Sequence, residues 1–155
     1  MALTRLNLKS SDLPTGSVLQ TVSANITASD NTTSSSFVDS TLSATITPVS
    51  TSSKILIIAN LSMYNAGIND QAVATVFRGT ASSGTNLGHS IYGFGSAYSH
   101  VGRVKNVVSV SYLDSPATTS AQVYTAAILR SGSVAGAYIN VNNEKSTLTL
   151  MEIAG

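Results

Sequence analysis

The stretch SATITPVSTSSKILIIANLSM, residues 43–63, decides the fold predicted for this chain. Leu42, Ala44 and Ile46 alternate with hydroxyl side chains, and a period of two places one face of a β-strand on a core and the other in water. Pro48 and the hydroxyl cluster that follows it end the strand, because proline lacks an N–H and Ser and Thr bond their own backbone in turns. Residues 55–59 are all aliphatic, which is typical of a strand covered on both faces. The two strands therefore predict a central β-hairpin within a packed sandwich.

Similar patterns, separated by turn signals, continue to the end of the chain. We expect strands at residues 17–24, 37–47, 54–64, 72–78, 104–114, 122–130, 137–141 and 146–153. In the seventh of these, Ala137, Ile139 and Val141 are expected to point inward and Asn140 outward. Eight or nine strands without a convincing helix predict an all-β fold, namely an antiparallel β-sandwich of jelly-roll type.

Two connections stand out between the expected strands. Residues 29–36 read as a polar loop, and residues 79–102 combine six glycines with Tyr92, Phe94 and Tyr98. Glycine-rich loops with aromatic residues are frequent at binding surfaces, since tyrosine offers contact area at a low entropic cost. The alternative for the second connection is a pair of short strands around residues 90–94, joined by structural turns.

The composition indicates one weakly charged domain. Charged residues make up 10% of the 155 residues, against about 25% in ordinary soluble domains. Serine and threonine supply 44 positions, and the net charge is +1. Such a surface lacks the charge repulsion that keeps many proteins monomeric, which favours permanent assembly. The alternative is a secreted monomer with a neutral surface.

The N-terminal segment, residues 1–16, is predicted to be an arm in front of a single domain at residues 17–155. Its leucines are spaced at intervals, and the sequence Pro14-Thr15-Gly16 stops any continuation. An extended arm of this kind is suited to lying on a neighbouring subunit, whereas the alternative is a frayed terminus. The arm residues expected to make contacts are Leu3, Arg5, Leu6 and Leu8.

Several chemistries lack the residues they need. The absence of cysteine excludes disulfides, thiolate catalysis and Cys-ligated metal. His89 and His100 are expected to be surface loop residues, although a histidine set on a threefold axis could hold an ion. The seven acids are spread singly, so no carboxylate pair suggests glycoside hydrolysis. We therefore expect a protein that is not an enzyme and has no cofactor and no metal.

Partners of two kinds are not expected. The eight basic residues are scattered, so no stripe of positive charge indicates nucleic-acid binding. The longest apolar stretch, residues 55–63, is far too short to cross a bilayer, and residues 1–12 have no continuous apolar region of a signal peptide. We expect neither nucleic acid nor a membrane among the partners.

Several segments resemble a module of virion proteins from tailed bacteriophages, especially marine and cyanobacterial ones. The resemblance covers residues 16–153 and is carried by GSVLQ (16–20), SFVD (36–39), LSATITP (42–48), SSKILI (52–57), RGT (78–80) and STLTLMEI (146–153). It implies a jelly-roll-like β-sandwich that forms homotrimers on the outside of the particle, as capsid decoration or as a fibre tip.

A fibre subunit usually carries a long shaft or attachment domain before its tip, whereas only about 16 residues precede the module here. The favoured reading is therefore a decoration (cement) protein on the outer surface of the virion, which binds the major capsid protein through the arm. The alternative is a tail-fibre tip that contacts a host receptor. Tyr92, Phe94 and Tyr98 are the expected recognition surface or trimer contact.

Overall fold

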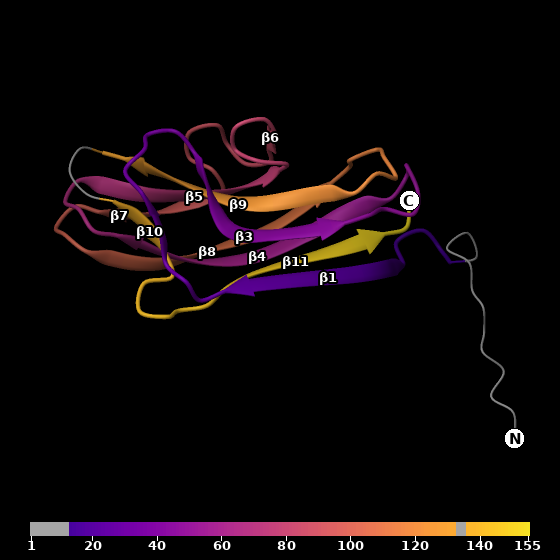
Figure 1. The fold of residues 1–155 in the computed structure, drawn as a ribbon, viewed down its shortest axis with the longest axis horizontal. Helices are drawn as coiled ribbons and strands as arrows, with labels where there is room; N and C mark the ends of the chain where they lie inside the picture. The colour runs from indigo at the N-terminus through magenta and orange to yellow at the C-terminus, as the bar shows by residue number, and fades with distance from the viewer. Residues whose placement is uncertain (1–12, 133–135) are drawn as a thin grey trace, which may run out of the picture.

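The computed structural model describes residues 13–132 and 136–155, and these residues form two antiparallel β-sheets packed face to face (Figure 1). The strands are β1 (Val18–Ile26), β2 (Asp30–Thr32), β3 (Val38–Ile46), β4 (Lys54–Asn65), β5 (Asp70–Arg78), β6 (Thr85–Asn86), β7 (Gly95–Ser99), β8 (Val104–Asp114), β9 (Gln122–Ser131), β10 (Ala137–Ile139) and β11 (Ser146–Ile153). The described chain has no helix long and apolar enough to cross a bilayer. The predicted all-β sandwich is confirmed.

The strand order is that of a jelly roll. One sheet runs β1-β11-β4 with β8 on the far side of β4, and β10 and β2 extend it beside β4. The other sheet runs β3-β9-β5, and β6 and β7 both pair with β5. Apart from the short β2, β6 and β10, the strands pair first with last, as β1·β11, β3·β9, β4·β8 and β5·β7. Such a chain is one long hairpin wound over itself, which gives the two Greek keys of a jelly roll.

The prediction that β3 and β4 form a β-hairpin is wrong. These strands lie in different sheets, so residues 47–53 carry the chain from one layer to the other. The alternation in β3 is as predicted, and Leu42 and Ile46 are buried together with Ile55 and Ile57 of β4 in one core cluster. Two apolar strand faces bury more surface by facing each other across a core than by lying side by side in one sheet.

The expectation that β4 is covered on both faces is also wrong. Ile55, Ile57 and Ala59 are fully buried, but Leu56 is half-buried and Ile58 is exposed. A sandwich has only two layers, so each sheet has one face turned away from the core. The aliphatic run therefore leaves apolar side chains on the outside of the described domain.

Asn140 corrects the expected inward and outward pattern near the C-terminus. Strand β10 ends at Ile139, and Asn140 has a positive φ of 58° and is completely buried, while Val141 is only half-buried. The Asn140 Nδ2 donates to the Ile26 carbonyl oxygen at 3.0 Å, and its Oδ1 accepts from the Ser146 hydroxyl at 2.7 Å. Asparagine tolerates the left-handed conformation, and its amide replaces ladder bonds that the turning backbone gives up.

Two of the connections predicted between strands contain short strands of their own. Residues 29–36, expected as a loop, include β2, which pairs with β10. The glycine-rich region contains β6 and β7, whereas the short strands considered around residues 90–94 reduce to one bridge between His89 and Gly93. Strands of two to five residues carry too few positions for a period of two to be visible in the sequence.

One charged cluster ties the two sheets together. Arg78 at the end of β5 donates from Nη1 to both carboxylate oxygens of Asp114 on β8, at 3.0 and 2.9 Å. The hydroxyl of Tyr124 on β9 donates to the Asp114 Oδ2 at 2.8 Å, and Tyr124 is fully buried. Burial and the hydrogen bond to Asp114 raise the pKa of Tyr124 above its ordinary value, so it stays a neutral donor.

A second buried carboxylate, Glu152 of β11, lies at the end of the sandwich where β3 crosses to β4. Its Oε1 accepts from the Val49 N–H at 2.7 Å, and its Oε2 accepts from the Gln20 Nε2 at 2.6 Å. Burial favours the protonated form of Glu152, but hydrogen bonds such as these outweigh it and lower the pKa below its ordinary value. Glu152 therefore fastens the crossover and β1 to the last strand while ionised.

Replacing Asp114 should cost far more than breaking an exposed ion pair. We expect Asp114→Ala to lower the free energy of unfolding by about 2–4 kcal/mol, because it leaves the Arg78 charge and the Tyr124 hydroxyl without their shared acceptor. The matched control is Glu144→Ala, which removes a more exposed ion pair with Lys105 together with a hydrogen bond from the Ser62 hydroxyl, and should cost about 1 kcal/mol. Urea denaturation measures both, and equal losses would contradict the assigned role of Asp114.

Glu152 should make the free energy of unfolding depend on pH in the acidic range. Because its folded pKa lies below its unfolded value, its contribution is complete above the unfolded pKa and is lost as the pH falls through the folded pKa. We expect Glu152→Gln to be less stable than the parent by about 1–3 kcal/mol at pH 7, with a smaller difference at pH 3. Urea unfolding at both pH values tests this, and a difference that does not shrink in acid would contradict it.

Candidate functional site

The glycine-rich region is an ordered cover on the outer face of one sheet. Val73, Thr75 and Phe77 of β5 point away from the core and are nevertheless buried. The cover is fastened to β5 by the pairing of β6 with β5 and by two further backbone hydrogen bonds, from the Leu87 N–H to the Val76 carbonyl at 3.0 Å and from the Phe94 N–H to the Ala74 carbonyl at 2.9 Å. Residues 79–94 therefore have a structural role as the tip of the wound hairpin.

Gly93 shows why glycine is needed in this cover. Its φ is +54°, and a Cβ atom added there would overlap the Ala74 carbonyl oxygen. The backbone of the cover can approach the β5 backbone this closely only without a side chain. Part of the glycine content that suggested a binding loop is thus explained by close packing.

The three aromatic residues predicted for recognition have different environments. Tyr92 and Tyr98 are exposed, with 57% and 55% of their surfaces accessible. Phe94 is half-buried and packs against the core, and its ring contacts the Tyr112 ring edge-on with centroids 5.7 Å apart. Tyr92 and Tyr98 are therefore available to a partner, whereas Phe94 mainly anchors the cover. The arm residues Leu3, Arg5, Leu6 and Leu8 lie outside the described residues.

Both histidines are on the surface. The His89 Nδ1 accepts hydrogen bonds from the N–H groups of Ile91 and Tyr92, both at 3.1 Å, and the ring stacks on Tyr92 with centroids 5.2 Å apart. His100 is exposed. Within the described ranges, no three His, Asp or Glu side chains are grouped so that they could hold a metal ion.

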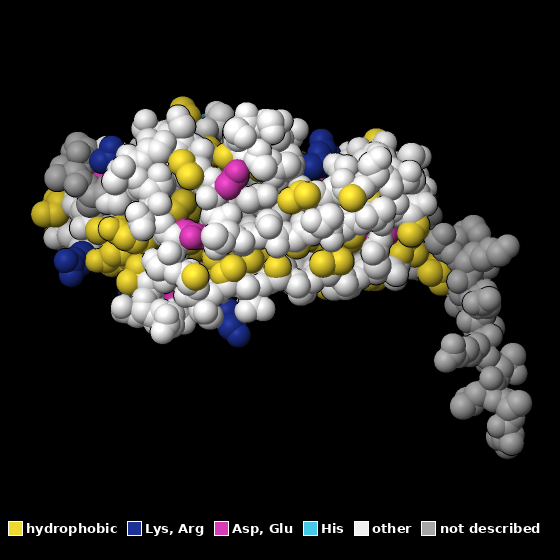
Figure 2. All heavy atoms as spheres, in the orientation of Figure 1, with side chains coloured by type: hydrophobic (Ala, Val, Ile, Leu, Met, Phe, Trp, Pro, Cys, Tyr) yellow, Lys and Arg dark blue, Asp and Glu magenta, His cyan; other side chains and the backbone are white. Residues whose placement is uncertain are grey.

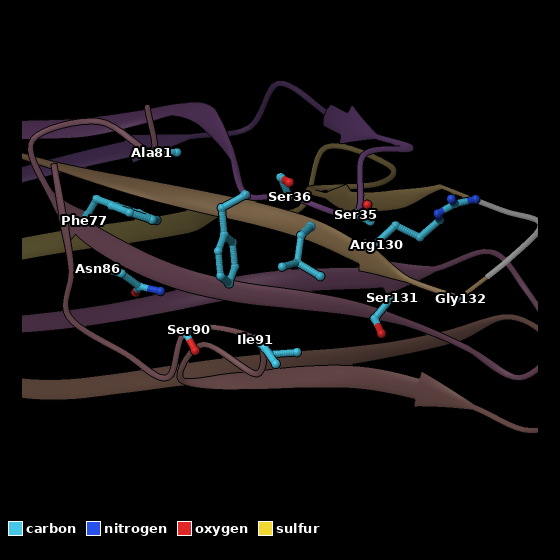
Figure 3. A pocket seen from close by; sticks show the side chains of 12 residues that line it. Ser35, Ser36, Phe77, Ala81, Asn86, Ser90, Ile91, Arg130, Ser131 and Gly132 are labelled. Atoms are coloured by element: carbon cyan, nitrogen blue, oxygen red, sulfur yellow. The ribbon is translucent and has the colours of Figure 1, made fainter. Parts of the chain in front are cut away.

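A groove with a volume of about 490 Å³ lies on this same outer face (Figure 3). Residues 35–37 form one wall, and Ala81, Asn86, Ser90 and Ile91 from the cover form the other. Phe77 and residues 129–132 form the floor. The Arg130 N–H donates to the Ser34 carbonyl at 2.9 Å, which holds the first wall against β9. The volume of the groove is within the range found for small-molecule binding sites.

The opposite sheet carries a different feature on its outer face, an apolar end patch. Register places Met151, Leu56 and Leu113 in one row across β11, β4 and β8, because directly paired residues point to the same face. The row is flanked by other apolar side chains on the same face. The complete patch is Val18, Leu56, Ile58, Leu113, Met151 and Ile153, of which Val18, Ile58 and Leu113 are 53%, 37% and 46% exposed.

The apolar end patch lies where the chain enters the sandwich. The Gly16 N–H donates to the Ala154 carbonyl at 2.8 Å, and the Ala154 N–H donates to the Ser17 carbonyl at 2.8 Å. Val18 and Ile153, two members of the patch, are direct partners just beyond these bonds. Figure 2 shows few charged side chains on the face it presents, with hydrophobic side chains at this end and along the edge between β1 and β3.

Sequence reasoning missed both the groove and the patch. The patch had a signal, because Leu56 and Ile58 make β4 apolar on both faces and a two-layer sandwich can cover only one of them. The sequence carried no signal of the groove, because the groove is lined by three separate parts of the chain. These include residues 35–37, Ser90, Ile91 and Arg130.

Fold and surfaces together define a jelly-roll β-sandwich protein with an apolar end patch on one sheet and a covered, grooved face on the other. No protein-family model and no curated protein sequence matches the chain. Similar solved structures include the VP2 subviral particle of infectious bursal disease virus, at 12% identity over 90% of this chain and 38% of that chain, with a TM-score of 0.47. T=1 particles derived from the same virus match at 12% identity over 90% and 37%, with a TM-score of 0.48. The chain thus spans less than two-fifths of these proteins.

Substituting Gly93 tests the structural role of the cover. We expect Gly93→Ala to lower the free energy of unfolding by about 2–4 kcal/mol, from left-handed strain plus the overlap with Ala74. The control is Gly102→Ala, which also has a positive φ but open space around it, and should cost no more than about 1–2 kcal/mol. Thermal and urea unfolding measure both, and an equal cost would show that the close approach to β5 is unimportant.

Proposed function

We propose that this protein is a virion structural protein that decorates the outside of a bacteriophage capsid as a homotrimer. The observation that carries the proposal is the apolar end patch. Soluble monomers rarely leave a contiguous apolar surface open, and patches of this kind mark contacts with other proteins. The low charge of the chain, 10% of residues, also favours permanent contacts, because few charges must lose water when the surfaces meet.

The contact is proposed to work by adding binding free energy to a shell. A trimer that bridges several capsid subunits stabilises the assembled state over the dissociated one, since it binds only where the subunits are correctly arranged. Strand β1 begins at Val18, a member of the patch, so the arm that precedes it is proposed to extend the same contact region. In this arrangement Leu3, Arg5, Leu6 and Leu8 contact the shell or the next protomer.

A tail-fibre tip is the second candidate, and the exposed rings of Tyr92 and Tyr98 favour it. Rigid aromatic side chains at the surface are common anchors for recognition. In this case the binding partner is a receptor on the host surface, and the protein is located on the tail. An enzymatic role is not proposed, because the buried carboxylates Asp114 and Glu152 are engaged in bonds that hold the sandwich together.

Removing apolar surface from the patch should weaken attachment without unfolding the domain. We expect the double variant Val18→Ser/Leu113→Ser to bind particles assembled without this chain at least about tenfold more weakly, since each buried aliphatic side chain contributes about 1.5–3 kcal/mol. The matched control is Val38→Ser/Val123→Ser, which removes two exposed apolar side chains from the other sheet. Quantitative sedimentation with particles measures occupancy, and thermal melting checks the fold.

Deleting residues 1–12 in the same assay tests the arm, and full occupancy of the truncated protein would contradict its role. Full occupancy of the patch variant would contradict capsid decoration through this face. If labelling places the protein on the tail, and host adsorption is lost in Tyr92→Ala or Tyr98→Ala, the fibre-tip function replaces the decoration function.

A further inference from the structure

One side of the sandwich carries the free edges of both sheets. Within the described chain, β1 lies at one end of its sheet and pairs with β11 alone, and β3 lies at one end of the other sheet and pairs with β9 alone. The two strands contact each other across the layers, so both edges open on the same side of the molecule (Figure 1). We call the line between these two strands the seam.

The seam leaves core-facing side chains of β1 partly open to water. Val22 and Ala24 pair with Leu150 and Leu148 of β11, and directly paired residues share one face of a sheet. Both leucines are completely buried, whereas Val22 and Ala24 are only half-buried against the same core. Figure 2 shows hydrophobic side chains along this edge. The core is therefore closed at β11 and incompletely covered at β1, where one more strand would bury it.

The edge of β1 lacks the usual protection of an exposed strand. Natural sheets discourage pairing at an edge with lysine, proline, a short strand or a bulge. β1 has nine residues, VLQTVSANI, with no charge and no proline, and its bulge lies at the start, between Val18 and Gln20. The part of β1 from Thr21 to Ile26 therefore offers a regular, uncharged backbone to a further strand.

The edge of β3 is protected. The Asp30 carboxylate crosses the seam, and its Oδ2 accepts from the Thr41 N–H at 2.7 Å and from the Thr41 hydroxyl at 2.8 Å. The pairing of β3 with β9 also shifts register between Asp39 and Ser43, and Asp39 places a charge in the strand. Both features are typical of an edge that resists pairing. The edge of β1 is thus the one open to addition.

Residues 1–12 have the length and the pattern to supply that strand. In the sequence, Leu6 and Leu8 alternate with Asn7 and Lys9, and a period of two places the leucines on one face of a strand and the polar residues on the other. At about 3.3 Å per residue, twelve residues reach about 40 Å, whereas the nine residues of β1 span about 30 Å. One apolar face is what a strand covering the seam requires.

The turn before β1 favours pairing between copies over a hairpin within one copy. The Ser17 N–H donates to the Pro14 carbonyl at 3.1 Å, and Gly16, third in this turn, has a φ of 90°. A positive φ at the third position is typical of a type II turn, whose twist splays the flanking strands, whereas tight hairpins use type I′ or II′ turns. This turn therefore does not direct the preceding residues into register with their own β1.

We propose that residues 4–10 of one copy add a strand to the free edge of β1 in a neighbouring copy. Leu6 and Leu8 lie over Val22 and Ala24, and backbone hydrogen bonds to β1 supply the rest of the contact. A slip of one residue would turn polar side chains onto the core, so the leucines set the register. Passed from each copy to the next, this head-to-tail contact closes into a ring.

This inference rests on the homotrimer of the proposed function, and it assigns Leu6 and Leu8 to the next protomer rather than to the shell. Decoration is measured with particles, whereas strand exchange is measured on the purified protein alone. Sedimentation equilibrium of the parent protein separates the two failures. If the parent is a monomer, the homotrimer fails and this inference fails with it, whereas a trimer without the contact overturns this inference alone.

Disulfide trapping tests the contact cleanly, because the chain has no cysteine. A tagged Asn7→Cys variant is co-expressed with an untagged variant that carries Thr21→Cys, Ser23→Cys or Asn25→Cys at an exposed position of β1. A disulfide between tagged and untagged chains joins two copies. We expect one β1 position to give at least about tenfold more mixed product than Ser111→Cys, an exposed residue on the outer face of the same sheet in β8, because distant cysteines cannot be bridged.

Each outcome of the trapping experiment has a defined meaning. Mixed product no greater than that of the Ser111→Cys control overturns the proposal. A disulfide that forms inside the double variant Asn7→Cys/Ser23→Cys, but not between co-expressed single variants, shows that the segment covers its own β1 and also overturns exchange.

The leucines provide a second test in the cross-linking pair. Leu6→Asn/Leu8→Asn, added to the Asn7→Cys chain, should lower the yield of mixed product at least about tenfold, because polar side chains then face the core. The matched control is Leu3→Asn, which removes a leucine from the other face of the alternation and should leave the yield unchanged. An unchanged yield in the double leucine variant would show that these side chains do not cover the seam.

Discussion

Burial of one face of each sheet against the other is the constraint on which this structure depends. The chain has no cysteine and few charges, so contact between the two apolar faces must supply most of the stabilising free energy. Leu42, Ile57 and Leu150 come from distant parts of the sequence and are all inaccessible to solvent. The jelly-roll winding satisfies the constraint, because it sends successive strands to alternate layers and pairs the first half of the chain with the second.

The same constraint determines where polar groups can be buried. Asp114 and Glu152 lie on inward-facing positions and are retained because several donors converge on each of them. Asp114 receives donors from the opposite sheet, and Glu152 receives one from the crossover between sheets. These bonds specify how the layers are aligned, which apolar contact alone, being non-directional, does not do.

The two outer faces are where the layers leave freedom for function. One is largely closed by residues 79–94 and 33–37, and the space left between these segments is the groove above Phe77 and Leu129. The other keeps the apolar end patch, which includes Val18 at the start of β1. A domain built this way can attach by one sheet and present the other, which is the arrangement proposed for a decorating subunit.

The sequence by itself determined eight of the eleven described strands, and in β3 it also determined the buried side, because a period of two records which side chains must leave water. It also excluded chemistry that needs cysteine. Only the tertiary structure decided that β3 and β4 lie in different sheets, that Asn140 turns inward, and that residues 35–37 and 90–91 line one groove. The physical reason is that periodicity reports one strand's contrast between two faces, whereas pairing and grooves depend on contacts between segments tens of residues apart.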